Sequence, residues 1–301
     1  MDTSTYPPEW NHVTLCKCAA LFVLAAALPG AAAAQRAPWG TSHLTVAGVN
    51  VMVGGVAAAA VALVSGEPVG PAFLGGAAGG LVVYGGKRVA ATRKTGAGFA
   101  GRQLAAVGGS MIRNAGAGQR PLHELVLPAW PLRIYLRPGG ASRVKVDGAT
   151  TAAALYFAIV NKATPDVGLS LSTGALVMRA DPGDLRRIGD MVATGESAAG
   201  VLIMDRSRTD DALRLLTAHE LVHVLQFDQV MLTIGEPAER GLARLHPWLR
   251  AVQERVDLGL IGGLHFLGND LLEYHDRPWE WEADFLTTGR AQDGPMILPG
   301  R

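Results

Sequence analysis

Cysteine is almost missing from this chain: of 301 residues only Cys16 and Cys18 are cysteines, and both lie near the start. Two thiols alone cannot complete a zinc site, and no disulfide can form after them. Charge is also scarce, with 18% charged residues and a formal net charge of +1. A nucleic-acid-binding protein normally carries a basic face with interleaved aromatics. None is found, so the sequence predicts no nucleic-acid partner.

What the chain has in excess is apolar and small residues. Hydrophobic residues make up 49% of it, and 38 residues are glycine. This composition is too apolar for a disordered chain, and more apolar than that of an ordinary soluble enzyme. The length suggests two compact units, or one domain with a substantial appendage.

The first apolar run, AALFVLAAALPGAAAA, occupies residues 19–34 and follows Lys17. Its small residues at the end fit the small-x-small pattern of a cleavage site. The pattern predicts that residues 1–34 are a signal peptide, cleaved near Gln35. The alternative is that the run stays uncleaved as a membrane anchor.

Two longer apolar runs follow, at residues 44–65 and 69–86, and neither contains a charged residue. Each is near the length needed to cross a bilayer, and GEPVGP between them is a turn signal. Four glycines of the second run have small-xxx-small spacing, which lets two helices approach closely in lipid. The sequence therefore predicts a Gly/Ala-rich, membrane-associated hairpin within residues 35–95. A buried helical pair in a soluble protein is the alternative.

Two signals for the orientation of this hairpin disagree. A cleaved signal peptide followed by two spans places the rest of the chain outside the cytoplasm. The basic residues after the hairpin favour the cytoplasmic side; they are Lys87, Arg88, Arg93 and Lys94. We expect an extracytoplasmic location, in a bacterial-type periplasm or cell envelope, and a cytoplasm-facing orientation stays open. Residues 96–120 are predicted to be a linker with one short helix.

From residue 121 the pattern changes to strands followed by helices, which indicates an α+β domain. Alternating β-type residues predict strands at 132–136 and 143–148, and the apolar run 199–205 predicts another. VGLSL and GALVMRA, joined by Ser-Thr-Gly, are predicted to form a β-hairpin, whereas residues 150–161 are predicted to be a helix. The predicted fold is thus α+β: an apolar Gly-rich helical hairpin, a small mixed or antiparallel sheet, and then the helices of a candidate site.

The tetrapeptide HELV occurs twice, at 123–126 and at 219–222. The first copy lies between two prolines in a segment with an extended pattern, and no histidine follows four residues after His123. This copy is predicted to be structural. The second copy lies in a helical pattern that Thr209 can cap and Gly235 can end.

In the second copy, His219 and His223 are four residues apart, so on a helix both point to one side and can bind one ion. Neutral imidazoles suit zinc, and Glu220 lies beside the open coordination position, where it can act as a general base. This spacing is the HExxH pattern. The alternative is a pair of histidines that binds no metal.

A third ligand is predicted in DRPWEWEADF, at residues 276–285. Glu280 and Asp284 are four residues apart and share a helical face, whereas Glu282 points to the opposite side. Glu280 makes physical sense as a ligand, because Asp284 can then accept the outer N–H of a zinc-bound histidine and fix its ring. Glu282 stays open as the alternative ligand.

HELVH followed by EWEAD resembles the gluzincin zinc metallopeptidases, whose third ligand lies in an ExxxD or ExxAD helix. Arg277 is also similar to the first position of the RxxExxAD pattern of the membrane-bound HtpX and CAAX-protease-type group. The resemblance implies a zincin-like metallopeptidase domain over residues 121–301 and a bound Zn²⁺. The residues that it assigns are the ligands His219, His223 and Glu280, the catalytic base Glu220, and Asp284, which supports a ligand from behind.

These observations predict a membrane-associated zinc endopeptidase that cleaves protein or peptide substrates, with Glu220 taking the proton of the attacking water. From another class, the alternative is a membrane-linked structural or interaction protein with a non-catalytic zincin-like helix. The strand at 199–205 is the predicted edge strand for an extended substrate. Trp279 and Trp281 are predicted to pack the last helix. The candidate donors for the oxyanion are Tyr274, His275, His246 and His265.

Overall fold

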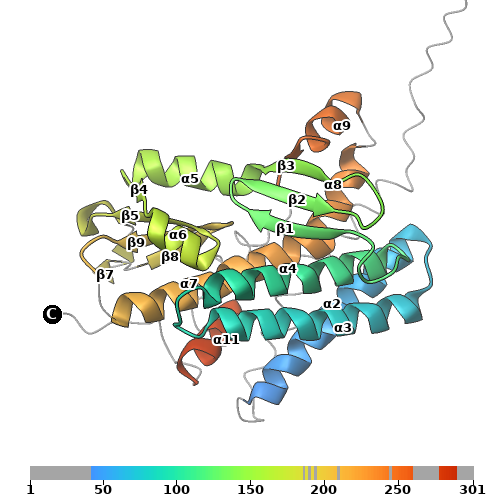
Figure 1. Cartoon of the computed structure of the whole chain (residues 1–301), viewed down its shortest axis with the longest axis horizontal. Helices are drawn as coiled ribbons and strands as arrows, with labels where there is room; N and C mark the ends of the chain where they lie inside the picture. Colours follow the sequence, from blue (N-terminus) through green and yellow to red (C-terminus); the bar gives the residue numbers. More distant parts are fainter. Residues whose placement is uncertain are drawn as a thin grey trace, which may run out of the picture.

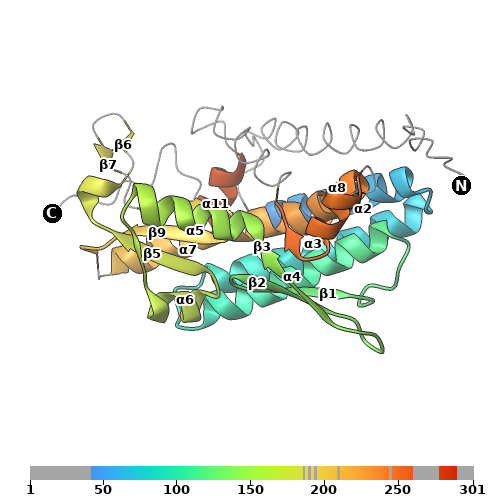
Figure 2. The same cartoon turned by 90° about the horizontal axis from the view of Figure 1, so that it is seen from above.

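The chain is described by a computed structural model over residues 42–185, 187–188, 191–192, 195–208, 211–243, 246–259 and 278–289. The predicted signal peptide lies outside these residues. The α+β class is confirmed: an apolar helical hairpin comes first, strands and short helices follow, and the helices of the candidate site come last. Helices α4 and α7 lie along the middle of the molecule (Figures 1 and 2).

The predicted helical hairpin consists of α2 (His43–Ser65) and α3 (Val69–Ala90). Ser42 caps α2, because its side chain accepts a hydrogen bond from the amide of Thr45. Gly66 ends α2 in the left-handed conformation, with a φ of 78°. Glycine adopts this conformation without steric cost, so the chain turns back within a few residues.

These two helices are the ones in the described part of the chain that are long and apolar enough to cross a membrane. Of the most apolar 18-residue window, 44% is buried inside the protein in α2 and 39% in α3. More than half of each window is therefore outside the protein interior. The large apolar side chains exposed on the two helices are those of Leu44, Met52, Leu63, Val69, Leu74 and Leu81. The hairpin thus packs on the protein with one side and presents an apolar surface on the other.

Glycines bring the backbones of α2 and α3 into contact. A Cβ on Gly80 would overlap the carbonyl oxygen of Asn50, and a Cβ on Gly54 would overlap that of Gly76. The small residues of this hairpin are therefore needed for the two helix backbones to lie this close together. Larger side chains at these positions would push the two helices apart.

We expect Gly80→Ala to destabilise the protein by about 1–3 kcal/mol, the usual cost of overpacking. Alanine favours a helix over glycine by about 1 kcal/mol, so the steric overlap has to outweigh that gain. Gly85→Ala is the matched control, because a Cβ there meets only the side chain of Leu104, at 3.8 Å. Thermal unfolding in detergent, followed by circular dichroism, measures both variants. Equal melting temperatures for the two would contradict the close packing.

Residues 96–120, predicted to be a linker with one short helix, instead contain the 20-residue helix α4 (Ala97–Gly116). It packs along α3 through small residues, and a Cβ on Gly101 or Gly108 would overlap the α3 backbone. Glycine lowers helix propensity, which is why the segment looks like a linker in the sequence. Close packing outweighs that propensity here, so the linker prediction is wrong.

Two four-stranded mixed sheets follow the helical layer. Sheet A has the order β1-β2-β3-β10, and only its β3–β10 pair is parallel. Sheet B has the order β4-β5-β9-β8, and only its β5–β9 pair is parallel. The strands of sheet A are β1 (Leu125–Ala129), β2 (Leu132–Leu136), β3 (Arg143–Asp147) and β10 (Val256–Asp257). Those of sheet B are β4 (Thr164–Pro165), β5 (Leu176–Ala180), β8 (Gly195–Ala198) and β9 (Val201–Asp205). A separate short pair is formed by β6 (Arg187–Ile188) and β7 (Met191–Val192).

Helices cover both faces of sheet B. Alternate residues of β5 point to opposite sides: Met178 packs with Phe157 of α5 (Gly148–Val160), and Val177 packs with α7 (Asp211–Val230). The helix predicted at the position of α5 is confirmed. The remaining helical elements are α6 (Val167–Thr173), η1 (Pro182–Asp184), η2 (Met231–Gly235), α8 (Glu236–Ala243), α9 (Pro247–Gln253) and α11 (Pro278–Thr288).

The segment VGLSL, predicted to be a strand, forms helix α6 instead. Asp166 caps it by accepting a hydrogen bond from the amide of Leu169 at 3.0 Å, and Gly174 ends it with a φ of 69°. A seven-residue apolar pattern fits a strand and a helix almost equally well. The cap and the stop residue decide in favour of the helix.

The run predicted as an edge strand at 199–205 forms β9, but its position at the edge is wrong. β9 lies between β5 and β8, and all five of its residues are buried. A continuous apolar run is typical of a strand that is covered on both faces. The outer strands of sheet B are β4 and β8.

The first HELV copy is extended only in its second half: Leu125 and Val126 begin β1, whereas His123 and Glu124 lie in the bend before it. Its Glu124 is buried, with Oε1 2.9 Å from Nη2 of Arg113 on α4. A buried carboxylate needs such a partner to offset its loss of hydration. This copy therefore joins β1 to α4 and is structural, as predicted.

Candidate metal centre

The second HELV copy lies in α7, whose residues 216–230 are all buried. Gly235 does not end this helix as predicted, because the chain continues through the π-helical turn η2 into α8. Glu236, the first residue of α8, lies 2.7 Å from Nη1 of Arg113, which holds the continuing helix against α4. The predicted N-cap, Thr209, lies outside the described residues.

Three side chains from two helices meet at one point. Nε2 of His219 and Nε2 of His223 lie 3.2 Å apart, and Oε2 of Glu280 lies 3.3 Å from the first and 3.2 Å from the second. Ligand atoms about 2.0–2.1 Å from a tetrahedral Zn²⁺ are about 3.3 Å from one another. The separations of the three atoms therefore fit a small tetrahedral cation. These three residues could hold a metal ion and are called the metal cluster below.

Burial and charge act together on these groups. Burial by itself would raise the pKa of Glu280, but His223 outweighs it and holds the pKa well below its usual range. Burial would lower the pKa of His223, but Glu280 outweighs it and raises this pKa to about 9. The two groups thus stabilise each other's charged form. A metal ion binds a neutral imidazole, so its binding here would release a proton, as is general for histidine ligands.

Of the two glutamates left open by the sequence, the structure brings Glu280 to the histidines. Glu282 points elsewhere, with Oε2 2.8 Å from Nζ of Lys87 on α3 and Oε1 2.6 Å from Nδ2 of Asn50 on α2. The two side chains are two residues apart on α11 and so face different sides of it. Glu282 is an ion-pair partner of the hairpin and lies outside the metal cluster.

Asp284 lies where the helical spacing predicts. Its Oδ1 is 3.3 Å from Nδ1 of His219, the ring nitrogen turned away from the metal cluster. The carboxylate is almost fully buried, so it interacts with the imidazole with little competition from water. The two atoms lie at ion-pair distance without meeting hydrogen-bond geometry. Asp284 is therefore near the position of an acceptor that would fix the orientation of a metal-bound histidine.

Gln226 supports the second histidine, a role that the sequence reading missed. Its Oε1 lies 2.8 Å from Nδ1 of His223, and its Nε2 lies 2.8 Å from Oε2 of Glu282. One sequence feature could have pointed to this role: Asn50 and Lys87 are polar residues in the apolar helices of the hairpin. Polar residues in such helices often have a function. Their partners, however, cannot be read from a single sequence.

Glu220, the predicted catalytic base, is buried next to His219 on α7. Its negative charge contributes to the raised pKa of His223. Glu220 does not belong to the three-residue cluster itself. A carboxylate near the ligands, but not one of them, is what a general base requires.

The other sequence candidates lie elsewhere or outside the described residues. Nδ1 of His246 accepts a hydrogen bond from the amide of Trp248 at 3.1 Å, so this exposed histidine caps α9. Trp281 stacks on Phe285 with ring centroids 6.5 Å apart, which agrees with its predicted packing role. The candidates outside the described residues are Tyr274, His275 and His265.

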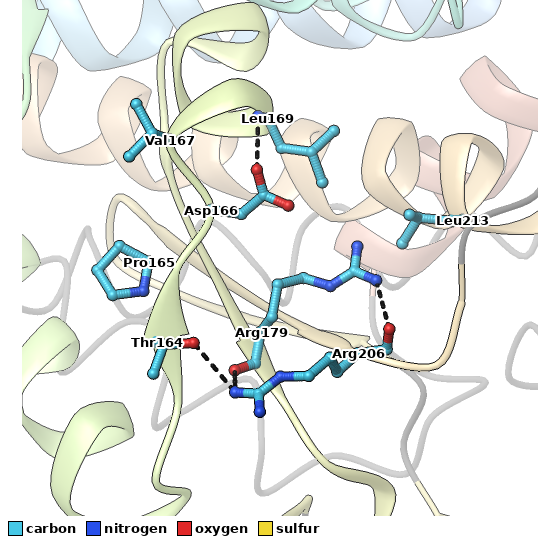
Figure 3. A pocket seen from close by; sticks show the side chains of 8 residues that line it. All are labelled: Thr164, Pro165, Asp166, Val167, Leu169, Arg179, Arg206 and Leu213. Carbon is cyan, nitrogen blue, oxygen red and sulfur yellow. Dashed lines mark hydrogen bonds between the residues drawn. The ribbon is translucent and has the colours of Figure 1, made fainter.

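A pocket of about 610 Å³ opens beside the outer strand β4 (Figure 3). Its two guanidinium groups are already used by the protein: Arg179 donates to the carbonyl of Arg206 at 2.9 Å, and Arg206 donates to Oγ1 of Thr164 at 3.0 Å. None of the residues lining it belongs to the metal cluster. The pocket is therefore separate from the candidate metal centre.

The comparisons with known proteins do not add to this picture. Searches of protein-family models, curated proteins and solved structures find no match for this chain. The site is therefore interpreted from its own residues, two histidines and a glutamate placed where they can hold a metal ion.

Proposed function

We propose that this protein is a membrane-associated zinc endopeptidase in which His219, His223 and Glu280 hold the metal. The observation that carries the proposal is the metal cluster: three ligand atoms within 3.3 Å of one another, contributed by two helices. Glu280 lies 61 residues after His219 in the sequence, so the cluster depends on the tertiary fold. The likeness of HELVH and EWEAD to the gluzincin motifs supports the same reading.

The chemistry of the donors supports zinc. Two imidazole nitrogens and one carboxylate oxygen form the ligand set of several catalytic zinc sites, which leave a fourth position open. Purely oxygen ligands would favour magnesium or calcium, and thiolates would favour a structural site. Asp284 and Gln226 behind the two imidazoles support a site in which the ring orientations are fixed.

A zinc ion bound here supplies a Lewis acid that activates water and polarises the scissile carbonyl. The Glu220 carboxylate accepts the proton of the attacking water and returns it to the leaving nitrogen. The Asp284 carboxylate lies behind His219, on the side of the ring turned away from the metal cluster. Burial of these groups strengthens each of these interactions, because little water screens them.

The outer strand β8 is the proposed binding edge for an extended substrate. Among the described residues it pairs with β9 alone, and it lies against α7, the helix that carries both histidines. A peptide added to its free edge would receive backbone hydrogen bonds that do not depend on side chains. The α2–α3 hairpin is the proposed membrane-associated part, with the site on the extracytoplasmic side.

The test is made on the purified full chain in detergent. We expect about one zinc per chain by elemental analysis. Cleavage of a peptide library should stop with a chelator and return when zinc is added. Chelation should also lower the melting temperature, because a metal bound to the native state stabilises it. A chain without zinc, with a melting temperature unchanged by chelator, would support the alternative of a non-catalytic, membrane-linked structural protein.

A further inference from the structure

Two buried residues of the hairpin lie at the end of a hydrogen-bonded chain that begins at the metal cluster. The chain runs from His223 through Gln226 and Glu282 to Lys87 and Asn50. Glu282 and Asn50 are 232 residues apart in the sequence. These contacts therefore join α2 and α3 to α11, which lie far apart in the sequence.

The first link decides how Gln226 is oriented. Its amide nitrogen lies 2.8 Å from Oε2 of Glu282 and 3.1 Å from the carbonyl oxygen of Trp279. Both of these partners can only accept hydrogen bonds, so the NH₂ group of Gln226 must face them. The amide oxygen is then turned to Nδ1 of His223, at 2.8 Å.

The orientation of Gln226 in turn fixes the imidazole. An amide oxygen can only accept, so Nδ1 of His223 has to carry a hydrogen. Nε2 is then the nitrogen left to bind a metal, and it is the one that faces His219 and Glu280. A ring held in this direction needs no rotation before Nε2 binds a metal.

The next link keeps Glu282 in place. Nζ of Lys87 lies 2.8 Å from Oε2 of Glu282 and 3.0 Å from Oδ1 of Asn50, and Nδ2 of Asn50 lies 2.6 Å from Oε1 of Glu282. Lys87 is 1% exposed, Asn50 3% and Glu282 7%. A carboxylate buried to this degree is held by its cation, and removing one partner of such a pair leaves the other uncompensated. Glu282 would then turn away, and Gln226 would lose its acceptor.

We propose that Lys87, Asn50 and Glu282 are positioning residues of the metal centre, which hold His223 ready for the metal through the amide of Gln226. The inference rests on the proposed function, and it makes the α2–α3 hairpin a part of the metal centre. His219 is supported by Asp284 from α11, the helix that also carries Glu280. His223, in contrast, depends on the hairpin being docked on α11.

The test compares two buried lysines. Lys87→Met removes the cation from Glu282, and the matched control Lys145→Met removes an equally buried cation from Asp257, at 3.1 Å on sheet A. Zinc affinity is measured on the full chain in detergent by competition with a chromogenic chelator. The visible absorption of the cobalt-substituted protein reports the geometry of the ligands, which a loss of stability alone would not change.

We expect Lys87→Met to weaken zinc binding about 10- to 100-fold, the range found when a partner behind a ligand is removed, and to change the cobalt spectrum. Lys145→Met should keep the wild-type affinity and spectrum. Gln226→Met, which leaves the pair of Lys87 and Glu282 intact, should weaken zinc binding to the same degree. It also serves as the second variant if Lys87→Met does not fold. Adding Lys87→Met to Gln226→Met should cause no further loss of zinc affinity, because the contact between residue 226 and His223 is already absent.

Three outcomes would overturn the inference. Wild-type affinity and cobalt spectrum in Lys87→Met or Gln226→Met would show that the chain of contacts does not position His223. Equal losses in Lys87→Met and Lys145→Met would show a general effect of stability. A wild-type protein that binds no zinc would overturn the proposed function and this inference together, whereas the first two outcomes leave the proposed function intact.

Discussion

Glu280→Ala is expected to weaken zinc binding by more than about 100-fold, beyond the loss usual for a partner that lies behind a ligand. Peptide cleavage should fall to background at the same time. The reason is geometric: Oε2 of Glu280 lies within 3.3 Å of the Nε2 atoms of both histidines, so it supplies the third corner of the site. Two imidazoles alone leave zinc with half of the usual four ligands.

Elemental analysis and chelator competition measure this loss, with Glu254→Ala as the control for nonspecific binding. Glu254 is exposed at the end of α9 and lies outside the metal cluster. Its removal should change neither zinc content nor cleavage. Wild-type zinc affinity in Glu280→Ala would contradict the assignment of this residue, and Glu282 would then have to be reconsidered.

The local part of the candidate metal centre could be predicted from the sequence, because helical periodicity determines it. His219 and His223, and likewise Glu280 and Asp284, are four residues apart, and on a helix such pairs share a face whatever surrounds them. The structure adds that the two faces meet. The periodicity also separates Glu280 from Glu282, and the structure places the two on different partners.

The long-range contacts could not be predicted in the same way. Gln226 has no spacing that links it to Lys87 or Asn50, since its role arises only when α2, α3, α7 and α11 are packed together. The linker prediction for residues 96–120 failed for a related reason. Propensity describes glycine in an isolated helix, and α4 is stabilised by contacts that an isolated helix lacks.

The buried ion pairs around Asp228 of α7 could not be predicted from the sequence either. Arg102 of α4 and Arg133 of β2 both reach Asp228, at 2.9 Å and 3.4 Å, and Arg133 also binds Asp147 at 2.9 Å. In the sequence these are four charged residues among many, and the usual expectation is that they are exposed. Their pairing fixes sheet A and α4 on α7, so the helix that carries the histidines is held from several sides.

Glu220→Gln is expected to lower kcat for peptide cleavage by about 10²- to 10⁴-fold, the range for loss of a general base, while zinc content stays at the wild-type value. The amide has nearly the size of the carboxylate but cannot accept the proton of the attacking water. Glu220 follows His219 in the chain and does not belong to the metal cluster, so its loss should leave the ligands in place. Steady-state cleavage and elemental analysis on the same sample measure the two quantities.

The first HELV copy provides the matched control, because Glu124→Gln is the same substitution in the same tetrapeptide. Glu124 pairs with Arg113 at 2.9 Å, and Arg113 also binds Glu236 at 2.7 Å, so its role is to neutralise a buried guanidinium. Glu124→Gln should therefore lower the melting temperature and leave kcat of the folded protein unchanged. Glu220→Gln should instead lower kcat and leave the melting temperature unchanged, since Glu220 has no role in pairing the buried arginine. Full activity in Glu220→Gln would refute the proposed mechanism, even with zinc bound.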